Sequence, residues 1–139
     1  MEFLCTGADC SVSLELARIF VCTFLAIVFL QSGVDKIVDR GGNIEWLTGH
    51  FASSPLAGFV PLMVTIVTAT ELVAGALTAI AVPVLLLSGG EAIAIAGISV
   101  SAVGLLMLLF GQRMAKDYAG AAVLVPYFVV AILGLVLFA

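Results

Sequence analysis

The chain has 139 residues, of which 63% are hydrophobic and only 10% are charged. A soluble domain of this length exposes a large share of its surface and could not bury so much apolar material, so the composition predicts a polytopic membrane protein. The net charge of -4, with no basic cluster, argues against nucleic acid and against a polybasic lipid-binding face. The expected partners are therefore membrane lipids and either other integral membrane subunits or further copies of the chain.

Four apolar stretches are long enough to cross a bilayer, because a spanning helix needs ~20 mostly apolar residues. They predict an all-α fold, an integral membrane four-helix bundle that forms a single domain over residues 1–139. No extramembrane domain is expected. The expected spans cover about residues 15–37, 60–83, 92–110 and 119–138.

The first loop is the only one expected to have structure of its own. The pair Gly41 and Gly42 is expected to break the first helix, and Asn43 to cap a short interfacial helix at about 43–52. Trp46 in that helix suits the headgroup level of a bilayer. His50 has the side chain of a pH switch, but a lone His beside aromatic residues is more often an interfacial or capping residue.

The three cysteines do not make a disulfide framework, and no CxxC pair is present. Cys22 lies inside an apolar run and is interpreted as a small packing residue. Cys5 and Cys10 lie in the polar N-terminal segment and are able to form a disulfide if that segment faces an oxidising compartment.

Glu71 lies near the middle of the second span, roughly 15 Å from either end at a rise of about 1.5 Å per residue. A carboxyl group at that depth is costly unless it is protonated, paired or facing a hydrated cavity. We expect Gln31 and Tyr127, from the first and fourth spans, to form a candidate intramembrane polar site with it. Two interpretations stay open: a functional group, or a protonated acid whose hydrogen bond to a neighbouring helix fixes the helix register.

Charged residues gather at the end of the first span and just before the fourth. Asp35 is expected to pair with Lys36 or Arg113 across neighbouring helix ends, which would join the first and third loops. A simpler interpretation is an interfacial cluster that sets the topology. The cluster comprises Asp35, Lys36, Arg113, Lys116 and Asp117.

Basic residues are unevenly distributed over the two sides of the bilayer. Of the 5 Lys and Arg residues, Arg18 alone lies outside the first and third loops, and it is expected to snorkel to the headgroups. The positive-inside rule then puts those loops in the cytoplasm and both termini outside.

Three pieces of the chain share a pattern with a known family: an Arg in the first span followed by FLQSGVDKI, then TELVAGAL, and GQRMAKDYAGA before the last span. With four spans and a Trp-bearing first loop, the chain resembles the DoxX-like family of small bacterial membrane proteins, and the last piece looks like that of Bacteroidetes members. The family is named from small membrane subunits of a thiosulfate:quinone oxidoreductase. The resemblance therefore implies a bacterial inner membrane and an association with membrane redox complexes or thiol homeostasis. It puts Lys36, Glu71 and Arg113 at recurring charged positions and brings no catalytic assignment.

The function expected first is an accessory or structural subunit of a membrane redox or respiratory complex, with a quinone at a shared site. One His and three scattered Cys cannot build a haem or iron–sulfur site, so the chain is expected to bind no cofactor of its own and no metal. The alternative is a small oligomeric carrier or channel in which Glu71 binds a proton or cation midway across the membrane. An autonomous quinone-dependent oxidoreductase would need a redox group that the sequence does not show, so a non-catalytic subunit is favoured.

Overall fold

A computed structural model describes residues 8–139, and every regular element in this range is a helix. Four of the helices, α1, α3, α4 and α5, are long and apolar enough to cross a membrane. The predicted all-α membrane bundle is thus confirmed, and the chain is a multi-pass membrane protein by the length and composition of its helices. The elements are α1 (Ala8–Val38), α2 (Arg40–His50), the 3-10 turn η1 (Ala57–Phe59), α3 (Val60–Ser88), α4 (Ala92–Met114) and α5 (Tyr118–Val136).

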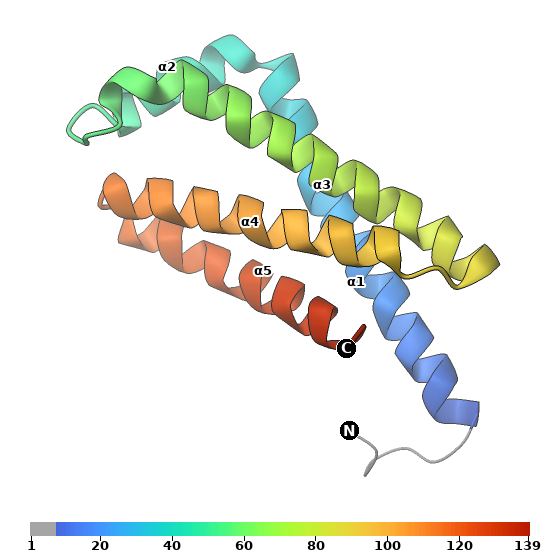
Figure 1. Cartoon of the computed structure of the whole chain (residues 1–139). Coiled ribbons are helices and arrows are strands. Elements are labelled where there is room, and N and C mark those ends of the chain that lie inside the picture. Colours follow the sequence, from blue (N-terminus) through green and yellow to red (C-terminus); the bar gives the residue numbers. More distant parts are fainter. Residues whose placement is uncertain (1–7) are drawn as a thin grey trace.

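The long helices pack in the order α1, α3, α4, α5, and α1 also crosses α4 and α5 (Figure 1). The main core lies where α1, α3 and α4 meet, around the fully buried side chains of Leu25, Phe29 and Ile98. A smaller apolar cluster around Phe51, Val60 and Val64 holds α2 and the following turn against the start of α3. The bundle therefore has one end covered by α2.

Glycines allow the long helices to approach one another closely. A side-chain carbon added at Gly75 would lie 2.8 Å from the backbone nitrogen of Leu30, and one added at Gly97 would lie 2.9 Å from the backbone nitrogen of Thr78. Backbone cannot move aside as the end of a long side chain can, so these two glycines set the α1–α3 and α3–α4 separations.

Two helix boundaries differ from the sequence-based expectation. Gly41 and Gly42 do not break the first helix; α1 ends before them, and they lie in the first turn of α2. Asp39, and not Asn43, caps α2, because its carboxylate accepts a hydrogen bond from the backbone nitrogen of Gly42 at 3.2 Å. The interfacial helix thus spans 40–50, where 43–52 was expected.

The second span was expected to end at about residue 83, but α3 continues beyond Pro83 for more than a turn. The helix ends at Gly89, whose φ of 67° lies in the left-handed region that glycine adopts without a steric penalty. A proline near the end of a helix removes one hydrogen bond and leaves the last turn intact, which explains the extra length.

Candidate functional site

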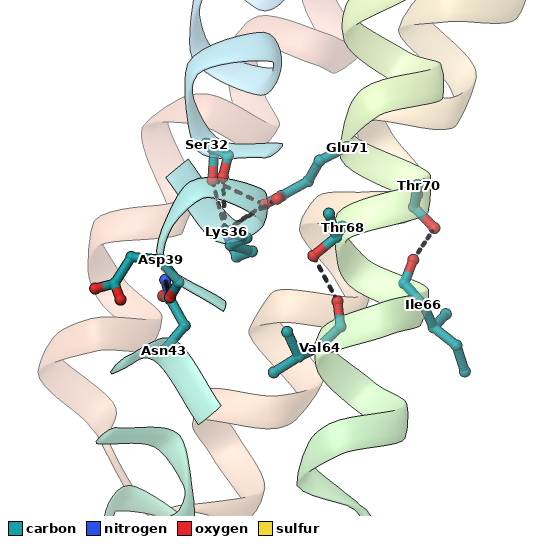
Figure 2. Close-up of polar contacts among 9 residues, drawn as sticks. All are labelled: Ser32, Lys36, Asp39, Asn43, Val64, Ile66, Thr68, Thr70 and Glu71. Carbon is teal, nitrogen blue, oxygen red and sulfur yellow. Dashed lines mark hydrogen bonds and ion pairs between the residues drawn. The ribbon is translucent and has the colours of Figure 1, made fainter. Parts of the chain in front are cut away.

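Glu71 projects from the middle of α3 toward the C-terminal part of α1 and is 1% exposed. Its Oε2 lies 2.9 Å from the ammonium nitrogen of Lys36, and its Oε1 accepts a hydrogen bond from the hydroxyl of Ser32 at 3.0 Å. Lys36 donates to Oε1 at 3.2 Å and to the Ser32 hydroxyl at 2.7 Å, which closes a triangle of contacts (Figure 2). Ser32, Lys36 and Glu71 are called the Lys36–Glu71 cluster below.

The sequence of α1 explains why the cluster forms. Ser32 and Lys36 are one helical turn apart and share the face of α1 that packs on α3. The opposite charges of Lys36 and Glu71 cancel, which lowers the free-energy cost of holding a carboxylate inside the bilayer. Although Oε2 lies at ion-pair distance from Lys36, it receives no hydrogen bond of good geometry from the described residues. The cluster is therefore neutral overall but incompletely hydrogen-bonded.

The structure does not bring the two expected partners to Glu71. Gln31 is exposed on α1, because the next residue, Ser32, occupies the face that meets α3. Tyr127 lies on α5 and stacks on Phe24, with ring centroids 5.9 Å apart. Sequence reasoning missed Ser32 and the direction of Lys36, although their spacing of one helical turn was the available signal.

The charged residues expected to join the first and third loops are distributed differently. Asp35 is exposed, and Lys36 contacts Glu71 in place of Asp35 or Arg113. Arg113 lies over the ring of Tyr118 at 4.6 Å from its centroid. Lys116 has a φ of 58° in the turn before α5.

His50 makes the link between the two loops. Its Nε2 lies 2.9 Å from Oε1 of Gln112, at the end of α4, and 3.6 Å from Oδ2 of Asp117. Asp117 also caps α5, since its carboxylate accepts a hydrogen bond from the backbone nitrogen of Gly120 at 2.8 Å. On its other side His50 stacks on the exposed ring of Trp46, with centroids 4.7 Å apart. These contacts tie α2 to the ends of α4 and α5.

An apolar pocket of about 110 Å³ lies between the ends of α1 and α4, α2 and the first half of α3. The pocket is smaller than the roughly 150 Å³ of a cavity that holds a benzene ring, so a ring would enter it only if the walls moved. Leu47, Phe51 and Met107 are among its apolar walls. Its polar lining comes from Lys36, whose side chain is 17% exposed, and from Gln112. The pocket thus joins the Lys36–Glu71 cluster to the His50 contacts.

Arg18 joins three helices at the opposite end of the bundle, and its expected extension to the headgroups stays a prediction. Its guanidinium lies 2.7 Å from the carboxylate of Glu91 and 2.9 Å from that of Glu15. Its Nε donates a hydrogen bond to the backbone oxygen of Leu137 at 2.9 Å, and the group lies over the Phe138 ring. These carboxylates and the carbonyl satisfy the guanidinium, whose side chain is 12% exposed.

Neither a disulfide nor a metal centre appears in the part of the chain that the structure describes. Cys5 lies outside the described residues, so its expected pairing with Cys10 stays a prediction. Cys22 is fully buried among the core residues, as a packing residue would be. Over residues 8–139 no group of His, Cys, Asp and Glu side chains is arranged to hold a metal ion.

No protein-family model, curated protein or solved structure matches this chain. The DoxX-like likeness therefore stays a prediction from the sequence pattern.

Proposed function

We propose that this chain is a non-catalytic accessory subunit of a quinone-linked membrane redox complex and that it borders the quinone site. The observation that carries the proposal is the apolar pocket beside Lys36, with polar groups at one end. A quinone site needs an apolar slot with one or two convergent polar groups that donate hydrogen bonds to the carbonyl oxygens. Gln112 has a side-chain amide that donates hydrogen bonds, whereas the three N–H groups of Lys36 are already directed at Ser32 and Glu71.

The redox groups of the complex would belong to its other subunits. Three Cys are too few for an iron–sulfur cluster held by four thiolates. His50 is already held between Gln112 and Trp46. The contribution of this chain is then to shape one wall of the site and to supply a hydrogen-bond donor to it, the Gln112 amide.

The enclosure of Glu71 favours this function over the carrier or channel alternative. A transported proton or cation would need access to the carboxylate, which is 1% exposed and already neutralised by Lys36. A cation would have to displace an ammonium group at 2.9 Å from Oε2. The cluster is better suited to fixing α1 against α3 and orienting Lys36 at the pocket.

We place the complex in a bacterial inner membrane, with the α1–α3 and α4–α5 connections in the cytoplasm. The basic residues Arg40, Arg113 and Lys116 lie at that end. Arg18 is the one Lys or Arg at the opposite end, and the positive-inside rule puts the end with more Lys and Arg in the cytoplasm.

Native purification in mild detergent, followed by mass spectrometry, tests the subunit proposal. We expect the chain to co-elute with subunits that carry haem, flavin or iron–sulfur groups. As a control, the same preparation from cells that express an untagged chain gives the background of non-specific membrane proteins. A homogeneous homo-oligomer free of other subunits would contradict the proposal and favour the carrier alternative.

A further inference from the structure

Gln31 is a polar side chain on the outer face of α1 that has no partner in its own chain. The residue is exposed, and its amide makes no hydrogen bond within residues 8–139. The next residue, Ser32, donates a hydrogen bond to Glu71, which projects from the middle of α3. The nearest exposed charge on α1, Asp35, follows one turn later, after a rise of about 6 Å. Gln31 therefore lies close to the depth of Glu71, where hydrocarbon would surround the bundle.

An amide at that depth is unfavourable when lipid alone surrounds it. Hydrocarbon offers no hydrogen-bond partner, so both the donor and the acceptor groups of the amide would stay unpaired. In membrane helices, Gln side chains form hydrogen bonds across to a neighbouring helix. The exposed amide therefore indicates that a further helix packs on this face of α1.

The residues above and below Gln31 form a straight apolar row along α1. They recur at alternate spacings of four and three residues, which is the pattern of contact positions between two helices packed along their length. All of them are exposed, whereas Leu25 and Phe29, on the opposite face of the helix, are buried in the core of the chain itself. This set, called the α1 row below, consists of Phe20, Phe24, Ile27, Gln31, Val34 and Val38.

A second copy of the chain supplies the missing partner of Gln31 by symmetry. Copies of a membrane protein insert in the same orientation, so a two-fold axis that relates two copies runs along the membrane normal. Identical residues of two α1 helices then meet at the same depth, and Gln31 faces Gln31 of the partner subunit. An amide is self-complementary, because its NH₂ group donates and its carbonyl oxygen accepts. A different subunit would have to carry a polar group at this depth, whereas a second copy always does.

We propose that the α1 row is the contact surface of a parallel homodimer, in which the two Gln31 side chains hydrogen-bond to each other inside the membrane. The apolar members of the row pack against their counterparts, and the single polar position fixes how the two helices align. Ser32 and Lys36 contact Glu71 on α3, so the dimer leaves the Lys36–Glu71 cluster intact. A pair of copies fits inside a larger complex as well as alone, so this inference does not depend on the subunit proposal.

Photo-crosslinking in membranes tests where two copies meet. p-Benzoylphenylalanine in place of Phe20 puts a photoreactive ring in the α1 row, and the same replacement of Phe110 puts one on the exposed face of α4. We expect the Phe20 position to give an adduct of two copies of this chain and the Phe110 position to give none. Adducts of the Phe20 position with lipid or another protein alone, or equal dimer adducts from both positions, would overturn the proposal.

Two substitutions of Gln31 test whether the amide stabilises the dimer. Donor-labelled and acceptor-labelled chains are mixed in phosphatidylcholine vesicles, and energy transfer measures the dissociation constant of the dimer. We expect Gln31→Leu to weaken the dimer by about threefold to tenfold, the usual effect of one hydrogen bond between membrane helices. Gln31→Asn keeps the amide on a shorter side chain and should lie between Gln31→Leu and the wild type.

The unfolding midpoint of the monomer separates this role from a structural one. Gln31 makes no hydrogen bond in its own chain, so Gln31→Leu should leave the midpoint measured in dilute detergent unchanged. A lowered midpoint would assign the amide to the fold and overturn the proposal. Equal dissociation constants for the wild type and Gln31→Leu would overturn it as well.

Discussion

Lys36→Met is expected to destabilise the protein by about 3–5 kcal/mol, the usual cost of leaving one partner of a buried ion pair without the other. Glu71 would keep a hydrogen bond from Ser32 only, in a position that is 1% exposed. The midpoint of thermal unfolding in detergent, followed by size-exclusion chromatography with fluorescence detection, measures the effect. Lys116→Met is the matched control, because Lys116 lies in the α4–α5 turn away from Glu71.

The double variant Lys36→Met/Glu71→Met separates two effects: the loss of an ion pair, and the cost of leaving one buried charge without its partner. Apolar side chains of similar volume often replace a buried ion pair without a loss of stability. We therefore expect the double variant to recover most of the stability lost in Lys36→Met. If the two single losses add in the double variant, Lys36 and Glu71 do not act as a pair and the cluster described here is contradicted.

Arg18→Ala is expected to destabilise the protein by about 3 kcal/mol, because hydrogen bonds to a charged group contribute more than neutral ones. The substitution removes the contacts that join α1 to Glu91 at the start of α4 and to Leu137 beyond the end of α5. α1 and α5 otherwise share few contacts, so α5 should loosen first. Hydrogen exchange of the C-terminal residues, together with the unfolding midpoint, measures this loss.

The controls for Arg18 use the same kind of change at another arginine. Arg40 contacts the Thr65 hydroxyl at 2.7 Å at an exposed position, so Arg40→Ala should cost below about 1 kcal/mol. Arg18→Lys keeps a positive charge near Glu91 but loses the planar group that reaches the Leu137 oxygen, and should fall between the two. Equal stability of Arg18→Ala and Arg40→Ala would contradict the role given to Arg18.

The sequence predicted the number and order of the spans because a long apolar run in a membrane protein has few alternatives to a helix. The ends were less predictable, since they depend on local caps. The Asp39 carboxylate decides where α2 begins, and Gly89 rather than Pro83 decides where α3 ends. Both signals are present in the sequence, but neither pattern excludes the competing signals at Asn43 and Pro83.

Glu71 was predictable as a site residue because a lone acid in an apolar run has to find a partner. Its actual partner was not, because Lys36 adjoins Asp35 and the sequence does not show which face of α1 meets α3. Gln31 and Tyr127 had suitable chemistry but lie on other faces. The pocket could not be predicted from the sequence either, because residues from α1, α2, α3 and α4 together form its walls.

Photolabelling of native membranes with an azido-quinone tests most directly whether this chain borders a quinone. After illumination and digestion, mass spectrometry identifies the labelled peptides, and excess unlabelled quinone provides the competition control. Labelling of this chain at the peptides that contain Met63 and Met107, lost on competition and in Val67→Phe, which adds a ring to the pocket wall, is the result we expect. Labelling that spares this chain, or that spreads evenly over its lipid-facing residues and resists competition, would contradict the proposed quinone site.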